Sequence, residues 1–154
     1  MDHETRGVGG ILGEALETSA NIQMYNNYNL GQVTAFYDLT DYLDMRSQMG
    51  SVVSAADKIA MKYNYYLKDT ASFHNNYGTT YYGAAGSVDN DAAYTAASFT
   101  SPTAQLGETA GDMAGKTLME ALNAWVASEN NTYEAAQWVV GTDGYPVPAS
   151  VQLK

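Results

Sequence analysis

The sequence contains one partial match to a phosphate-binding loop, but the spacing of its glycines does not fit that motif. Residues 111–117 (Gly-Asp-Met-Ala-Gly-Lys-Thr) end like the loop G-x-x-x-x-G-K-[ST], whose backbone amides and lysine hold phosphates. The first glycine of that loop lies five residues before the second, and here Ala110 occupies that position. The loop must also follow a buried strand, whereas Pro102 precedes this segment. We therefore expect no nucleotide site.

Two acidic groups have the oxygen ligands that Ca²⁺ or Mg²⁺ prefers. Asp38, Asp41 and Asp44 recur at every third residue, but on a helix the first and the last point in different directions. Residues 89–91 (Asp-Asn-Asp) lack the glycine and the distant glutamate of an EF-hand loop. We expect solvated acids at both places, with no metal and no other cofactor.

No catalytic arrangement of nucleophile and base is visible in the sequence. The two histidines are His3, in an expected tail, and His74, beside an asparagine. A serine nucleophile in an elbow would show the pattern Gly-x-Ser-x-Gly, which does not occur. We therefore expect a protein that is not an enzyme, although a reproducible ligand beside His74 or Asp89 would revive that possibility.

Composition excludes further classes of protein. The 154-residue chain has 17 acidic and 7 basic side chains, a net charge of −10 that repels phosphate, so we expect no direct nucleic-acid binding. Without cysteine, the chain forms no disulfide framework and no cysteine-ligated zinc site. No apolar run is long enough to span a membrane, and the N-terminus shows no signal peptide.

The core-forming residues are sparse, and tyrosine is abundant. Leu, Val, Ile and Phe together number 26, whereas there are 13 Tyr and 7 Met. A tyrosine ring buries a large apolar area while its hydroxyl needs a partner or water, which suits contacts between proteins. We therefore expect a single domain over residues 1–154 with a thin core, stabilised further by contacts between subunits.

The apolar spacing predicts helices in two regions. In residues 7–68 it predicts one helix over 7–24 and another over 32–68, where Val52, Ile59 and Tyr63 belong to the apolar stripe. In residues 106–140 it predicts a long helix from about 104 to 128 and a short helix ending near 140. We find no convincing tandem repeat, and the expected fold is a mainly α-helical small bundle.

Three glycines of the second helical region share a spacing of four residues. Gly107, Gly111 and Gly115 would lie on one face of a helix, where another helix could approach closely. We name this set the glycine seam. The alternative is a locally broken start of the helix, because glycine disfavours helix by about 1 kcal/mol per residue relative to alanine.

Two segments lack helical spacing and are expected to contact neighbouring subunits. Residues 70–105 are rich in Tyr, Gly and Asn, which is compatible with a short β-hairpin or a long interaction loop, and we expect the interaction loop. Residues 141–154 carry two prolines and are expected to form an extended tail that is free or docks on a neighbour. The expected contact residues are Tyr77, Tyr81, Tyr82, Tyr94, Phe99, Tyr145, Pro146 and Val147.

These observations predict a structural, non-enzymatic subunit of a repeating assembly, such as a virion component or an extracellular filament. Its partners would be copies of itself or other structural subunits. The alternative is a secreted glycan-binding or adhesive module that uses the exposed rings of Tyr77, Tyr81 and Tyr82, since tyrosine, asparagine and aspartate suit sugar contacts.

Overall fold

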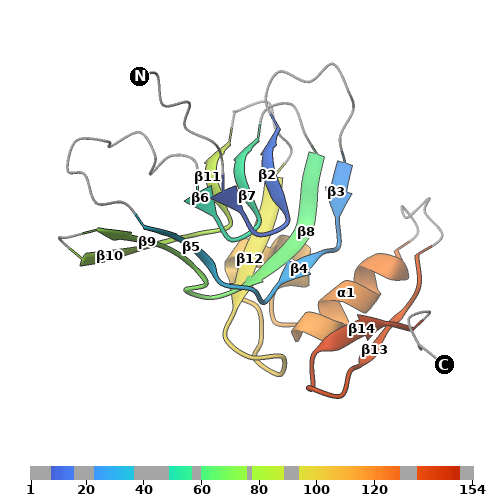
Figure 1. Cartoon of the computed structure of the whole chain (residues 1–154). Coiled ribbons are helices and arrows are strands. Elements are labelled where there is room, and N and C mark those ends of the chain that lie inside the picture. Colours follow the sequence, from blue (N-terminus) through green and yellow to red (C-terminus); the bar gives the residue numbers. More distant parts are fainter. Residues whose placement is uncertain are drawn as a thin grey trace.

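The chain is mostly β-sheet, so the expectation of a mainly α-helical bundle is wrong. The structure is a computed structural model, shown in Figure 1. It describes residues 8–15, 23–36, 49–56, 60–75, 78–88, 94–128 and 135–149.

The strands and helices follow one another in this order. The strands up to the second coil are β1 (Val8–Gly9), β2 (Leu12–Ala15), β3 (Gln23–Tyr25), β4 (Tyr28–Asn29), β5 (Val33–Phe36), β6 (Met49–Gly50), β7 (Val53–Ala56), β8 (Ala60–Leu67) and β9 (Ala71–Asn75). The remaining elements are β10 (Gly78–Tyr82), β11 (Ala85–Val88), β12 (Tyr94–Phe99), the 3-10 helix η2 (Glu108–Met113), α1 (Leu118–Val126), β13 (Trp138–Val140) and β14 (Pro146–Pro148).

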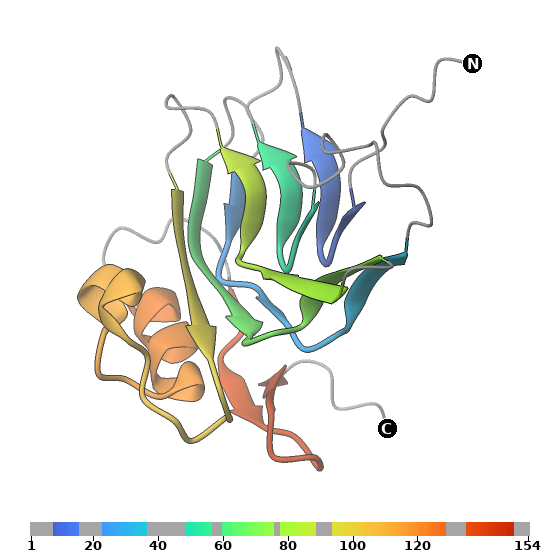
Figure 2. The ribbon, with the colours of Figure 1, turned by 90° about the vertical axis from the view of Figure 1, so that its left-hand side faces the viewer.

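Parallel pairing arranges the strands in three stacked coils, as in a parallel β-solenoid. The order β2–β7–β11 forms one sheet, in which Leu12 pairs with Val53 and Val53 pairs with Ala85 (Figure 2). A second sheet has the order β3–β8–β12, and Met24 pairs with Met61 there. Parallel neighbours cannot be joined by a tight turn, so the chain must travel around before it returns beside itself. Each circuit is one coil.

Additional pairings complete the coils. Strand β4 pairs with β8, β5 pairs with β9, and β1 pairs with β6, all of them parallel. Strand β10 departs from the pattern, because it forms an antiparallel hairpin with β9. The long loop expected for residues 70–105 is therefore wrong for the described residues: the alternative, a short hairpin, exists at β9–β10, and β11 and β12 continue the stack.

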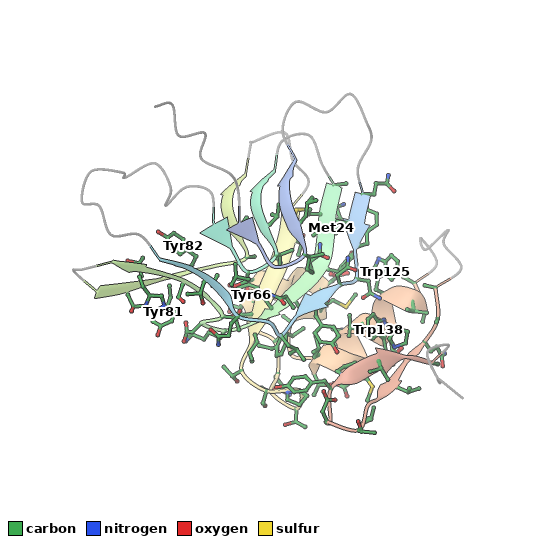
Figure 3. The ribbon with its side chains drawn as sticks, viewed as in Figure 1. Met24, Tyr66, Tyr81, Tyr82, Trp125 and Trp138 are labelled. Carbon is green, nitrogen blue, oxygen red and sulfur yellow. The ribbon has the colours of Figure 1, made fainter. Side chains whose placement is uncertain are left out.

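The interior of the coils is a small apolar core. Val52, Val53 and Met61 are fully buried there, together with Ala84. The half-buried Met24 and Tyr66 pack against this cluster from β3 and β8, and both are labelled in Figure 3. Because the interior of a coil is narrow, small residues such as alanine and valine fill it, and few large aliphatic residues are needed.

Close contact between coils requires glycine at position 50. The backbone of the second coil bonds to both neighbours here: Ile11 N–H donates to the Val52 carbonyl at 2.9 Å, and Val52 N–H donates to the Ala84 carbonyl at 2.8 Å. A Cβ on Gly50 would lie 2.2 Å from the Val53 carbonyl oxygen and 2.6 Å from the Ala84 carbonyl oxygen. These contacts are with backbone, which cannot move aside without disturbing the ladder.

A buried asparagine also links the first two coils. Asn64 is fully buried; its side-chain NH₂ donates to the Met24 carbonyl at 2.8 Å, and its oxygen accepts from the Asn27 side chain at 3.1 Å. Asn27 in turn donates to the Tyr25 carbonyl at 2.8 Å. Since a buried amide is costly unless it is hydrogen-bonded, these bonds fix the register of β3 against β8.

A larger core covers the outer face of the β3–β8–β12 sheet. Tyr65 and Phe99 project from the sheet into it and are almost completely buried. The covering side chains come from the helical segment, chiefly Leu106, Leu118 and Leu122. Figure 1 shows η2, α1 and the β13–β14 hairpin gathered on this side of the molecule. The C-terminal third of the described chain thus covers the solenoid laterally.

The helices expected over 7–24 and 32–68 are wrong, because the described residues of both ranges form strands and the connections between them. The apolar residues there belong to strands that are buried on two faces. Such strands read as nearly continuous apolar runs, which helical spacing matches by chance. In β8 the alternation is also broken at Tyr63, whose φ of 57° is left-handed, so inward and outward residues change places there. Residues 7, 16–22, 37–48 and 57–59 of the two expected helices lie outside the described residues, so the correction concerns the remaining residues.

The helix expected over 104–128 exists only in its second half. Thr117 begins α1 with a capping box: its hydroxyl accepts from the Glu120 N–H, and Glu120 accepts from the Thr117 N–H at 2.8 Å. Before it, Gly111 and Gly115 have φ values of 61° and 79°, which end regular helix. The helix face required by the glycine seam therefore does not form, and a Cβ on Gly107, Gly111 or Gly115 would meet no atom within 4 Å.

The tail expected to reach a neighbour folds back on its own chain as far as residue 149. Strand β14 pairs with β13, with Val147 opposite Val139. The Tyr28 hydroxyl donates to the Pro146 carbonyl, and Pro146 is buried. Residues 146–148 are thus extended, as expected, but they pair with their own chain instead of being free or docking on a neighbour, while residues 150–154 lie outside the described part.

In the part of the chain that the structure describes, no helix has both the length and the apolar character needed to cross a membrane.

We predict that Gly50→Ala lowers the free energy of unfolding by about 1–3 kcal/mol, because the added methyl group must displace backbone. Gly107→Ala is the matched control, since its Cβ meets open space and its φ of −77° suits alanine. We expect this control to change stability by less than about 1 kcal/mol. Urea denaturation measures both, and equal losses would contradict the stacking described here.

Candidate functional site

The candidate site is a hollow of about 300 Å³ between the outer face of the solenoid and the covering helices. We call it the aromatic hollow. Strand β3 contributes Tyr25, and β8 contributes Lys62 and Tyr63. The opposite wall comes from η2 and α1, and the complete lining is Tyr25, Lys62, Tyr63, Asp112, Met113, Trp125 and Ser128.

A repeated backbone distortion positions the solenoid wall of this hollow. Asn26 and Tyr63 both have left-handed backbone, with φ values of 58° and 57°. Since Tyr25 pairs with Lys62 and Tyr28 pairs with Tyr65, these two residues occupy matching places in neighbouring coils. Left-handed backbone costs a residue with a side chain about 1–2 kcal/mol, and such strain concentrates at functional sites. The strain therefore supports a functional interpretation of this wall.

Two aromatic rings meet across the hollow. The ring centroids of Tyr25 and Trp125 lie 6.2 Å apart, and the ring planes are tilted by 38°. Both side chains are half-buried. Trp125 comes from α1, and Figure 3 shows it at the end of the molecule that carries the helix and the hairpin. The pair makes a rigid apolar wall that bears polar ends.

Polar groups surround this wall. The Tyr63 hydroxyl faces the Asp112 carboxylate at 3.5 Å, and burial together with this negative charge raises the pKa of Tyr63, so its hydroxyl stays protonated and donates. Lys62 is exposed and adds a cationic donor. The Lys116 ammonium donates to the Asp112 main-chain carbonyl at 3.0 Å, which holds the loop carrying the carboxylate. Acceptor and donor groups thus lie beside an aromatic wall.

This arrangement suits a ligand with an apolar face and a rim of hydroxyl groups. The face would lie against Tyr25 or Trp125, while hydroxyls exchange hydrogen bonds with Asp112 and Lys62. Among the described lining residues Asp112 is the single carboxylate, and no group of His, Asp and Glu among the described residues could hold a metal ion. The site therefore offers recognition by stacking and hydrogen bonds.

The tyrosines predicted to contact partners lie elsewhere and are not brought together. Tyr81 is 59% exposed and Tyr82 is half-buried, both on β10 at a different end of the molecule from Trp125 (Figure 3). Phe99 belongs to the outer core, where it is only 2% exposed. Tyr77 and the side chain of Tyr94 lie outside what the structure describes.

In the C-terminal hairpin, the three residues predicted as subunit contacts have different environments. Tyr145 packs against the outer core, with its ring centroid 6.5 Å from that of Phe99. Pro146 is buried, whereas Val147 is 37% exposed. Pro146 therefore offers little surface to a neighbouring subunit, whereas Val147 remains accessible, and the contact roles of these residues stay predictions.

Of the histidines and acidic groups that the sequence singled out, the structure describes His74. His74 on β9 is held by two hydroxyls: Ser72 lies 3.0 Å from its Nε2 and Thr79 lies 2.8 Å from its Nδ1. His3, the acids at 38, 41 and 44, and residues 89–91 lie outside the described residues.

Sequence reasoning missed Tyr25, Tyr63 and Trp125, because it assigned them to helix stripes and a turn. A signal for the solenoid wall was present in the runs Tyr25–Asn29 and Tyr63–Tyr66, which are both rich in tyrosine and asparagine. The structure stacks this part of the first coil on the second, with Tyr25 opposite Lys62 and Tyr28 opposite Tyr65, although the sequence shows no convincing tandem repeat.

Comparison with known proteins gave no match: no family model fits the chain, and neither the curated proteins nor the solved structures include a similar one. A function for this protein must therefore be argued from the residues of the hollow and their surroundings.

We predict that Tyr65→Phe leaves the protein at least as stable at neutral pH. Tyr65 lies in the outer core, 1% exposed, and its buried hydroxyl has no hydrogen-bond partner among the described residues. An unsatisfied buried hydroxyl costs about 1–3 kcal/mol, so removing it is neutral or stabilising. Urea denaturation at pH 7 tests this, and a loss above about 1 kcal/mol would show that the hydroxyl is bonded.

The same variant should change the alkaline stability. Burial, and then the negative charge of Asp112, raise the pKa of Tyr65 above its ordinary value. The folded state therefore keeps a proton that the unfolded chain releases above about pH 10, and wild-type stability falls as the pH rises beyond that value. Tyr65→Phe should flatten this fall. Tyr81→Phe, at an exposed position, is the control.

Proposed function

We propose that this protein is a non-enzymatic module that binds saccharides in the aromatic hollow. The observation that carries the proposal is the fixed pair of Tyr25 and Trp125 beside Asp112 and Lys62. A sugar ring has a face of C–H groups that packs against an aromatic ring and hydroxyls that both donate and accept. Small-molecule sites generally combine apolar walls with a few placed polar groups in this way.

Charge favours a saccharide over other stacking ligands. Nucleic-acid bases also stack on aromatic rings, but such sites run along a positively charged groove. Here the net charge of the chain is −10, and Lys62 is balanced by Asp112 across the hollow. An uncharged ligand avoids repulsion by the acidic surface.

We favour binding without catalysis on the basis of the described polar groups. Glycoside hydrolysis normally uses two carboxyl groups on either side of the bond that breaks. The described lining supplies Asp112, which is exposed and lies close to Tyr63 and Lys116. This group can accept hydrogen bonds from a sugar, and among the described lining residues no second acid lies beside it.

A second proposal is that the protein assembles with copies of itself or with other structural subunits, in a virion or an extracellular filament. The β13–β14 hairpin favours it, because Val140 is 61% exposed and the paired Val139 and Val147 are each 37% exposed. Adjoining exposed aliphatic residues mark contact surfaces more often than single ones do. The proposal is compatible with sugar binding, since display on a repeating structure multiplies weak contacts.

Trp125→Ala is predicted to weaken saccharide binding by about tenfold or more, since one stacked ring contributes about 1–3 kcal/mol in comparable sites. A glycan array on the wild-type protein supplies the ligand, and titration followed by calorimetry gives the affinity. Lys62→Ala, an exposed position, serves as a second variant that should fold normally and bind more weakly.

Tyr81→Ala is the control for the site, because it removes an exposed ring on β10 far from the hollow. We expect no change in affinity. A loss confined to Tyr81→Ala would place the sugar on β10 instead, and a wild-type protein that binds no glycan would refute the proposal.

The assembly proposal predicts that light scattering detects oligomers at micromolar concentration and that Val140→Lys shifts them toward monomer. Thr142→Lys, also exposed on this hairpin, is the matched control for added charge. A monomer at all concentrations would refute assembly through the hairpin.

A further inference from the structure

A second hollow adjoins the aromatic hollow. Its volume is about 200 Å³, and its lining comes from β3, α1 and the segment around β13 and β14. Its lining residues are Tyr25, Asn26, Trp125, Ala135, Ala136, Trp138 and Pro148. Tyr25 and Trp125 line both hollows, so the two hollows share this pair of rings.

The second hollow has its own aromatic residue in a fixed position. Trp138 is half-buried on β13, and Asn123 of α1 holds its backbone from both sides. The Asn123 side chain donates to the Trp138 carbonyl at 3.0 Å and accepts from the Trp138 N–H at 2.8 Å. The Trp138 ring also packs against Tyr28, with centroids 5.7 Å apart. Trp125 and Trp138 both lie at the end of the molecule that carries the helix and the hairpin, as Figure 3 shows.

We infer that the two hollows are adjoining subsites for a linear, uncharged oligosaccharide of at least two sugar units. The inference rests on the proposed function and adds the class of ligand to it. One unit lies in the aromatic hollow against Asp112 and Lys62, the chain crosses the Tyr25–Trp125 pair, and the next unit lies against Trp138. Repeated sugar units present repeated apolar faces, which matches aromatic residues placed in succession.

The size of the hollows supports subsites. Pockets that enclose a whole drug-sized ligand have volumes of about 300–1,000 Å³. The two hollows, of about 300 and 200 Å³, lie at or below the lower end of that range. Each therefore holds a part of a longer ligand.

The charges of the two linings select an uncharged chain. In the first hollow Lys62 and Asp112 balance each other, and the described lining of the second hollow has no charged residue. A sulfated sugar or a uronic acid would be attracted by one cation, Lys62, but repelled by a protein whose net charge is −10. Asn26, whose amide donates to the Leu122 carbonyl at 3.2 Å, adds a neutral polar residue to the second hollow.

The test is a chain-length series on the full chain. The probes are oligosaccharides of one to six units built on the strongest linear glycan from the array, with cello- and malto-oligosaccharides included. Calorimetry gives the affinity and tryptophan fluorescence gives an independent signal from Trp125 and Trp138. We expect the affinity to rise at least tenfold from one unit to the length that spans both hollows and then to level off.

Ala136→Arg separates the subsites, because Ala136 lines the second hollow only and is exposed. A long side chain there should remove the gain from chain length and leave the affinity for one unit unchanged. Thr142→Arg, exposed on the hairpin and outside both linings, adds the same charge and should keep the gain.

The outcomes distinguish the two levels of the proposal. Equal affinity for one unit and six units, or an unchanged gain in Ala136→Arg, would overturn the two-subsite inference while saccharide binding stands. Tighter binding of a sulfated series than of its uncharged counterpart would overturn the selection by charge. No response to any saccharide would refute the proposed function itself.

Discussion

Backbone hydrogen bonding between successive coils is the constraint on which the rest of this structure depends. The second coil bonds to the first through Ile11 N–H and to the third through the Ala84 carbonyl, so its strands have neighbours on both sides. Parallel neighbours require a complete circuit of chain between them. Each circuit therefore places its residues beside the matching positions of the previous coil. The left-handed backbone at Asn26 in the first coil, for example, is found again at the matching position, Tyr63, in the second coil.

The site is a consequence of this repetition and of the way in which the helices cover it. The stacked distortions at Asn26 and Tyr63 shape one wall, and α1 brings Trp125 against Tyr25 from the other side. The β13–β14 hairpin adds Trp138, fixed by Asn123. Residues from the first coil, the second coil and the C-terminal segment therefore meet at one place, although about a hundred positions separate Tyr25 from Trp125 in the sequence.

The sequence predicted single features more successfully than the fold. Helix was expected around Leu118–Val126 and occurs there, because Thr117 and Glu120 form a local cap that does not depend on the rest of the chain. The stripe through Val52 and Tyr63 was assigned to helix, because strands buried on both faces lack alternation. Pairing between residues more than thirty positions apart, such as Met24 with Met61, leaves no local pattern. The hollow could not be predicted for the same reason: its walls meet only through those pairings.

The sparse aliphatic content also has a structural explanation. A narrow coil interior is filled by residues such as Val52, Val53 and Ala84, and the aromatic rings of Tyr65 and Phe99 fill the outer core. A high tyrosine content is thus compatible with a chain that forms two internal cores of its own. The contacts between subunits that composition suggested remain a proposal centred on the exposed valines of the hairpin.

Nuclear Overhauser contacts between backbone protons test the parallel stack most directly. The account predicts contacts between the strand pairs that contain Met24 and Met61, and between those that contain Met61 and Tyr94, in parallel register. Contacts between residues three and four positions apart throughout 60–67, with none between β3 and β8, would show a helix there and contradict the account.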